Sequence, residues 1–170
     1  MIDEDVARKL AAAVITQGGI ELGPVRELED GWFFPYRTEL VGSQGVIVNK
    51  RTGRTFELGS AFPAERDLKL YDRGWQSTHY DLVILTIADL RETRRVIEKL
   101  PLSVVEPTYE HGRVWRVPRT LTACERRDQL EKLPCLFPAV PLYFHFEALE
   151  EAREARWFTF EAIEYRPAKA

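Results

Sequence analysis

The chain of 170 residues is poor in the residue types that build metal and nucleophile sites. It holds two cysteines, three histidines and one methionine. No histidine stands at a spacing typical of zinc ligands, and none is paired with a cysteine as in a zinc finger. Gly18-Gly19 follows a predicted helix, whereas a phosphate-binding loop needs a strand before it and a helix after it. We therefore expect no metal, no cofactor and no enzymatic activity.

Long runs of one kind are also missing. The formal net charge is −3, and no stretch of one sign dominates. A general nucleic-acid binder shows a clustered basic excess, so we expect no nucleic-acid partner. The apolar runs are too short to span a bilayer, and residues 3–5 are acidic where a secretory signal is basic. These features predict a cytoplasmic protein with reduced thiols that does not act at a membrane.

Three neighbouring stretches predict an antiparallel β-meander. They are the aromatic strand Trp32–Thr38, the apolar strand Val46–Asn49 and the strand Thr55–Leu58. Lys50-Arg51-Thr52-Gly53 forms the turn between the last two, where Gly53 suits a position of positive φ. This region holds almost no catalytic residue types, so it favours binding over chemistry.

The order of aromatic and glycine residues in the meander resembles the immunity protein 35 (YrhB-like) family. The residues that carry the resemblance are Gly31-Trp32-Phe33-Phe34, Gly45-Val46-Ile47-Val48-Asn49-Lys50, Thr52-Gly53 and Leu58-Gly59-Ser60-Ala61. Asn49 stands where the family often has Asp. The resemblance spans residues 3–73, under half of the chain.

Members of that family are predicted bacterial antitoxins of polymorphic toxin systems, and they have no catalytic motif to carry over. The resemblance implies an immunity protein that neutralises a cognate protein toxin by direct contact. One family member is described as a small chaperone. The alternative is therefore a chaperone or scaffold that binds exposed apolar segments of client proteins. A homodimer is left open.

The remaining patterns predict an α+β fold in two parts. In residues 1–74, the meander is preceded by a helix at Asp5–Ile15 and a strand at Ile20–Leu28, and is followed by a helix at Ala64–Tyr71. Residues 75–170 predict a second antiparallel α+β part in a split β-α-β-like order. The boundary segment Asp72–Thr78 is short and carries Trp75, so we expect the two parts to be packed together.

The second part is predicted element by element. Its expected elements are a strand at Tyr80–Ile87, a helix at Asp89–Leu100, strands at Leu102–Pro107 and Val114–Val117, a helix from Thr120 or Thr122 to Leu133, and strands at Leu142–Glu147 and Trp157–Tyr165. Glu110-His111-Gly112-Arg113 is expected to be a turn. Residues 148–156 fit either a short helix or a charged loop.

Candidate toxin-binding residues follow from the chemistry of tight interfaces. Trp, Tyr and Arg anchors concentrate binding energy, and carboxylates suit a basic cleft of a nuclease toxin. The candidates are Glu27, Glu29, Asp30, Trp75, Arg113, Trp115, Glu150 and Glu151. For each aromatic residue a place in the core is the competing interpretation, and for each carboxylate a solvated face.

A third function class is an enzyme that uses Cys135 or His111. A cysteine nucleophile needs a histidine brought close by the fold, and either His111 or His145 could serve. Buried, inert thiols are far commoner. No positive feature of the sequence favours this class.

Overall fold

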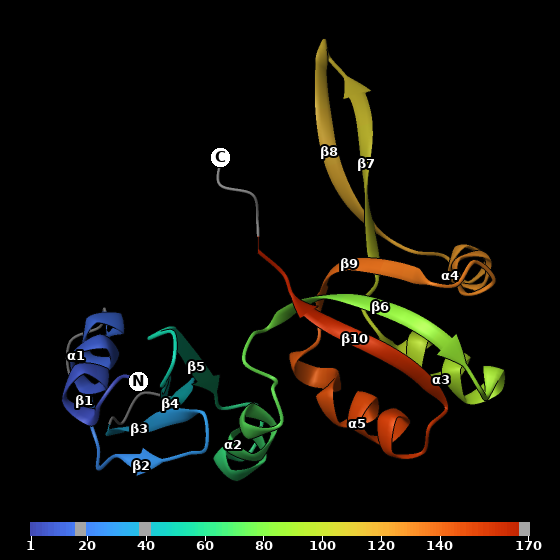
Figure 1. Cartoon of the computed structure of the whole chain (residues 1–170). Coiled ribbons are helices and arrows are strands. Elements are labelled where there is room, and N and C mark those ends of the chain that lie inside the picture. The colour runs from blue at the N-terminus through green and yellow to red at the C-terminus, as the bar shows by residue number, and fades with distance from the viewer. Residues whose placement is uncertain (16–19, 38–41, 167–170) are drawn as a thin grey trace. The chain divides into compact units, whose positions relative to one another are not determined.

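The computed structural model describes residues 1–15, 20–37 and 42–166, and it divides the chain into two compact units, Met1–Gln76 and Ser77–Ala170 (Figure 1). Both units combine helices with antiparallel sheets, so the predicted α+β fold class is confirmed. Among the described residues, no helix combines the length and the apolar character that a membrane crossing requires.

The unit Met1–Gln76 contains the predicted helix, meander and second helix. Its elements are α1 (Glu4–Val14), β1 (Glu21–Leu22), β2 (Arg26–Glu27), β3 (Gly31–Arg37), β4 (Ser43–Asn49), β5 (Thr55–Gly59) and α2 (Ala64–Asp72). The sheet order is β1-β3-β4-β5, and β2 also pairs with β3. The strand expected at Ile20–Leu28 is two short strands on either side of Pro24, because proline has no N–H to donate to a sheet.

Both faces of this sheet are covered within the unit. On one face, α1 places Ala7 and Ala11 in a core cluster with Phe34, Val46 and Val48, all without exposed surface. On the other face, Ile47 is opposite Phe56 in the register, and the Phe56 ring lies 6.1 Å from the ring of Tyr71 in α2. Helices α1 and α2 thus contribute to the core on opposite faces of the sheet.

The unit Ser77–Ala170 is built around a three-stranded antiparallel sheet in the order β10-β6-β9. Its elements are β6 (His79–Ile87), α3 (Leu90–Lys99), β7 (Ser103–Glu110), β8 (Arg113–Thr120), α4 (Ala123–Leu130), β9 (Cys135–Pro141), the 3-10 helix η1 (Tyr143–His145), α5 (Phe146–Glu154) and β10 (Phe158–Glu164). Helices α3 and α5 lie on the same face of this sheet (Figure 1). Within the part of the chain that the structure describes, strands β7 and β8 pair only with each other and form a sheet of their own, which the strand order in the sequence does not indicate.

One predicted strand is wrong. Leu142–Glu147 forms η1 and the start of α5, whereas the strand lies just before it, at Cys135–Pro141. The apolar residues Leu142, Phe146 and Leu149 are buried at helical spacing and point into one core. Pro138 and Pro141 both belong to β9, which lies at the edge of its sheet, where a missing N–H is tolerated.

Helix starts follow local chemistry. Asp3 and Asp89 accept hydrogen bonds from the backbone N–H groups of Val6 and Glu92, at the first turns of α1 and α3. Thr122 begins α4 in a capping box with Glu125. Residues 148–156, for which the sequence left helix and loop open, lie mainly in α5.

Candidate functional site

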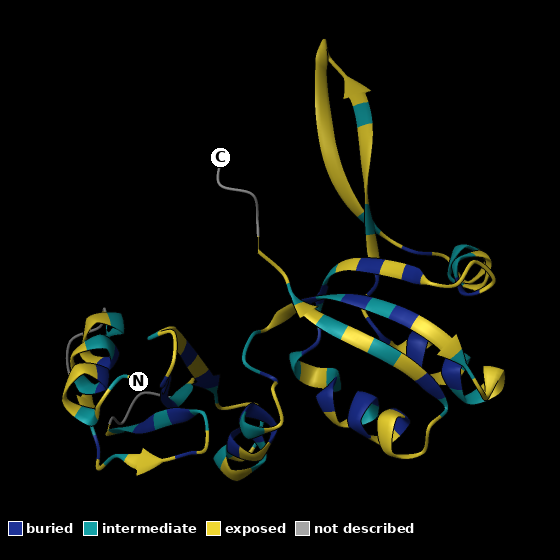
Figure 2. Ribbon diagram, viewed as in Figure 1, coloured by how far each residue is buried: buried dark blue, intermediate teal, exposed yellow. Residues whose placement is uncertain are grey.

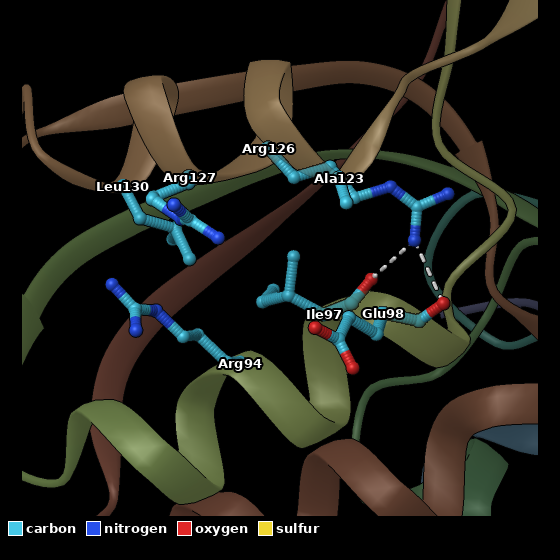
Figure 3. A pocket seen from close by; sticks show the side chains of 7 residues that line it. All are labelled: Arg94, Ile97, Glu98, Ala123, Arg126, Arg127 and Leu130. Carbon is cyan, nitrogen blue, oxygen red and sulfur yellow. Dashed lines mark hydrogen bonds between the residues drawn. The ribbon is translucent and has the colours of Figure 1, made fainter.

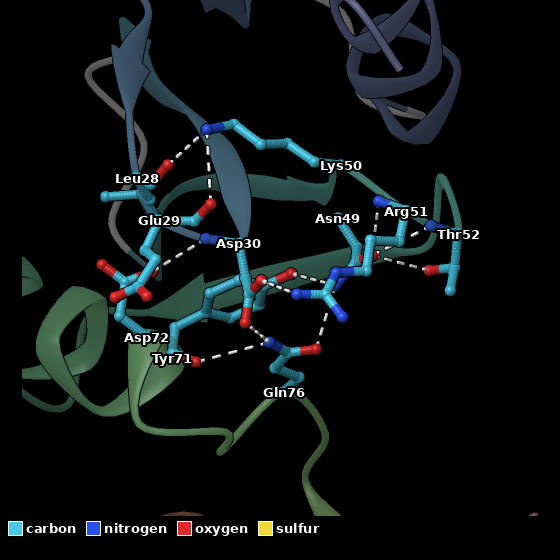
Figure 4. Close-up of polar contacts among 10 residues, drawn as sticks. All are labelled: Leu28, Glu29, Asp30, Asn49, Lys50, Arg51, Thr52, Tyr71, Asp72 and Gln76. Atoms are coloured by element: carbon cyan, nitrogen blue, oxygen red, sulfur yellow. Dashed lines mark hydrogen bonds and ion pairs between the residues drawn. The ribbon is translucent and has the colours of Figure 1, made fainter. Parts of the chain in front are cut away.

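The acidic candidates of the first unit lie around a buried lysine. The Nζ atom of Lys50 donates hydrogen bonds to the carbonyl oxygen of Leu28 at 2.5 Å and to a carboxylate oxygen of Glu27 at 2.8 Å. The same atom lies 4.9 Å from the centre of the Trp32 ring. Only 8% of Lys50 is exposed. The ammonium group thus holds the turn between β2 and β3 against the end of β4 (Figure 4).

Asp30 belongs to the same polar network. Its carboxylate accepts from Arg51 at 3.3 Å and from Gln76 at 3.4 Å, and its backbone N–H donates to Asp72. Glu29 is exposed, and its carbonyl oxygen accepts from Lys50 at 3.4 Å. Of the three acidic candidates in the first unit, Glu27 and Asp30 therefore have cationic partners within that unit.

Asn49 organises the neighbouring turn. Its Oδ1 atom accepts from the backbone N–H groups of Arg51 and Thr52, both at 2.9 Å. Its Nδ2 atom donates to the hydroxyl of Tyr71 at 3.2 Å and to the amide oxygen of Gln76 at 2.9 Å. Gly53, at the end of the turn, has the expected positive φ of 70°. This cluster stabilises the fold. Its hydrogen bonds account for the polar side chains at this turn, so no bound ligand is needed to explain them.

Of three further candidates, Trp75 and Glu150 are buried and only Glu151 is exposed. Trp75 is only 3% exposed, so the expectation that its ring serves as a surface anchor is corrected: the indole belongs to the packed interior. Glu150 is 8% exposed and forms an ion pair with Arg153 one helical turn further along α5. Glu151, the next residue, points to the exposed side of the same helix.

Arg113 and Trp115 lie together on the β7–β8 hairpin, which we call the arm. The arm is exposed along almost its whole length (Figure 2). Its two-residue turn is the predicted one: His111 and Gly112 have φ angles of 51° and 76°, as a tight hairpin turn requires. Because isolated two-stranded ribbons are only marginally stable in water, an uncovered arm calls for an explanation.

The register divides the arm into two faces. Residues opposite one another point to the same side, so one face consists of Val105, Pro107, Tyr109, Val114, Arg116 and Pro118. We call it the apolar arm face; it carries one cation and no carboxylate. Trp115 and Val117 lie on the opposite face, next to Thr108 and Glu106. Each face therefore offers a large apolar side chain near an arginine.

The exposure of these side chains is unusual for their type. The exposed fractions are 72% for Tyr109, 66% for Val114, 55% for Val105, 52% for Trp115 and 48% for Val117. Of the arm residues, only Arg113 and Trp115 were predicted from the sequence to contact a partner. The missed signal is the cross-strand pairing of apolar residues, such as Tyr109 with Val114, in a hairpin with no other element assigned to cover it.

The base of the arm is fixed by charge. Arg119 on β8 pairs with Glu106 on β7 at 2.7 Å and with Glu125 of α4 at 2.5 Å. The hydrogen bond from Arg119, with those from Thr122, lowers the pKa of Glu125 to about 2. These contacts anchor the arm at α4 and leave its distal half, with Tyr109, Arg113 and Trp115, without partners in the described chain.

An enzyme would use Cys135 or His111 as its reactive residue, and their surroundings do not activate either for catalysis. Cys135 is buried in β9, and burial raises the pKa of its thiol, which disfavours the reactive thiolate. His145 lies in η1, where burial lowers its pKa, and His111 is at the exposed tip of the arm. In the described part of the chain, no group of three His, Cys, Asp or Glu side chains is placed to hold a metal ion.

Comparison of the chain with protein-family models, curated proteins and solved structures gives no significant match. The resemblance to the immunity protein 35 family therefore stays an expectation from the sequence.

Proposed function

We propose that this chain is a bacterial immunity protein that binds and neutralises a cognate toxin by direct contact, with the arm as the main contact. The class of partner rests on the resemblance of the first unit to the immunity protein 35 family. The observation that supports binding is the uncovered arm, with Tyr109 and Trp115 exposed on opposite faces of one ribbon.

The physical chemistry of the arm favours a protein partner. Contiguous apolar surface left in water is a common mark of interaction sites, because its burial is favourable by about 25 cal/mol per Å². Tyr, Trp and Arg are the residue types that dominate binding energy at interfaces. Arg113 and Arg116 have no ion pair within the described chain, so an acidic rim on the toxin would complement them.

The test combines capture with rescue. The tagged chain is used to capture partners from its native host, and the main partner is expressed with and without it. We expect one stoichiometric partner that is toxic alone and harmless when co-expressed. Absence of rescue by the chain would contradict the immunity function.

Matched variants then test the arm itself. Y109S/W115S is expected to abolish rescue, because it removes both exposed rings. The control I163S/L136S changes two apolar side chains of the same unit outside the arm, each 52% exposed, and should rescue like the natural chain. Equal rescue by both variants would exclude the arm as the toxin contact.

The second candidate is a chaperone or scaffold, which the apolar arm face also suits. Such a protein would bind many unfolded clients weakly through Val105, Tyr109 and Val114. Capture of heterogeneous clients without a toxic partner, together with reduced aggregation of heat-denatured proteins in its presence, would favour this function over immunity.

A further inference from the structure

A pocket lies between α3 and α4 (Figure 3). Its lining residues are Arg94, Ile97 and Glu98 of α3, and Ala123, Arg126, Arg127 and Leu130 of α4. None of them was selected from the sequence, because the pocket exists only where the two helices meet.

Arg126 has a structural task in this pocket. Its guanidinium donates to the carbonyl oxygens of Ile97 at 3.3 Å and Glu98 at 2.7 Å, and its Nε atom donates to the carbonyl of Leu121 at 3.1 Å. The first two bonds satisfy carbonyl groups at the end of α3, where a helix lacks internal donors, and the third binds the carbonyl of Leu121 just before α4. Figure 3 shows this guanidinium at one end of the pocket, bonded to the two α3 carbonyls.

Arg94 and Arg127 carry charge that the described residues do not compensate. Their guanidinium groups lie at the other end of the pocket (Figure 3), and neither has an ion pair or hydrogen bond in the described chain. The Nε atom of Arg94 is buried and has no acceptor among the described residues. A buried donor without a partner is rare and calls for a missing acceptor. Glu98 is the only carboxylate among the lining residues, so the pocket is cationic.

Part of the pocket lining is apolar, namely Ile97 and Leu130. Ile97 is 1% exposed and Leu130 is 5% exposed, so both belong to the core and present only a small apolar floor. An arginine pair can bind carboxylates through parallel N–H donors, while an apolar floor accepts an aliphatic side chain. The combination fits a short peptide that carries an aliphatic residue next to carboxylates.

A nucleic-acid backbone suits the pocket less well. Phosphate binding gains strength from many cationic contacts along a track, whereas α4 also carries Asp128 and leads into Glu131, both exposed. Two guanidinium groups without ion pairs in the described chain are few for a phosphate backbone but sufficient for a compact acidic ligand.

We propose that the α3–α4 pocket binds an acidic peptide segment of a protein partner, with Arg94 and Arg127 contacting its carboxylates and Ile97 and Leu130 contacting an aliphatic side chain. The proposal rests on the proposed function only for the identity of the protein that carries the segment. The pocket is tested directly with peptides, so failure here is distinguishable from failure of toxin rescue.

The first experiment measures fluorescence anisotropy of a labelled Glu-Asp-Leu-Glu-Asp peptide with the full chain. The variant R94Q/R127Q is compared with R91Q/K132Q, which removes the same charge from exposed positions outside the pocket. We expect Kd to rise at least about tenfold in the pocket variant, because charge-assisted hydrogen bonds are lost, and less than about twofold in the control. An equal change in both variants would overturn the proposal.

Two further measurements address ligand class and folding. The amide peptide Gln-Asn-Leu-Gln-Asn should not bind; equal binding would overturn the role of the arginines. Inorganic phosphate or a single-stranded oligonucleotide that displaces the peptide at lower concentration would assign the pocket to phosphates instead. Because Arg127 is exposed, the R127E variant should fold normally. We expect this variant to bind the basic peptide Lys-Arg-Leu-Lys-Arg more tightly than the acidic peptide. A continued preference for the acidic peptide would contradict the proposal.

Discussion

At the scale of single residues, Lys50 shows how a buried charge is accommodated. Its ammonium group has two short hydrogen bonds, to Leu28 and Glu27, and lies over the Trp32 ring. Lys50→Met should lower the free energy of unfolding by about 1–3 kcal/mol, because the buried carbonyl of Leu28 loses its donor. Glu27→Gln should cost less than about 1 kcal/mol, since that side chain is 66% exposed. Urea unfolding followed by tryptophan fluorescence measures the free energy of unfolding of both variants. Equal losses in the two variants would contradict the larger role assigned to Lys50.

Asn49 is the second residue whose exchange is informative. Asn49→Ala removes two donors and the acceptor of the turn, and should destabilise the unit Met1–Gln76 by about 2 kcal/mol or more. Asn49→Asp, the residue often found in the resembling family, keeps the acceptor for Arg51 and Thr52. We expect it to retain most of the stability in the same urea experiment. A larger loss in the Asp variant than in the Ala variant would contradict this expectation and show that burying a carboxylate at this position outweighs the two turn bonds that it keeps.

At the scale of elements, the arm base depends on an ionised Glu125. The folded pKa of about 2 lies below the ordinary 4.5, so the contribution of this group is present above pH 4.5 and is lost as the pH falls toward 2. We expect amide protection in α4 to decrease over that range, and Glu125→Gln to remove this part of the pH dependence. An NMR titration of the full chain measures both; an unchanged profile in the variant would contradict the assignment.

The arm also predicts where a protease acts. Arg113 and Arg116 lie in an exposed ribbon that is paired only with itself, so trypsin should cut there first within residues 77–166. Mass spectrometry of early digests identifies the sites, and the bound partner should protect them. First cuts in α3 or α5 would instead indicate that the arm is covered in solution.

At the scale of the whole molecule, each of the two units has a core of its own. The fragment 77–170 contains every strand of the β10-β6-β9 sheet and the helices α3 and α5. We expect it to fold alone and to give a dispersed NMR spectrum that overlays that of the whole chain away from residue 77. A poorly dispersed spectrum would mean that the fold of this fragment depends on residues 1–76.

Local signals were sufficient for much of the fold. Asp89 and Thr122 predicted helix starts because their side chains satisfy N–H groups only two or three residues away. The turns at Gly53 and at Glu110–Arg113 could be predicted because glycine readily adopts the positive φ angles that such turns require. The strand at 142–147 failed because the same apolar residues fit two periodicities, and only packing against the core selects one.

The sequence by itself determined the α+β class, the meander and the residue types available for binding, since these depend on neighbours along the chain. Tertiary structure alone decided which of those residues remain accessible. It buried Trp75, paired Glu27 with Lys50, left Tyr109 and Trp115 in water, and placed Arg94 beside Arg127. Burial and charge pairing join residues far apart in sequence, so no local pattern encodes them.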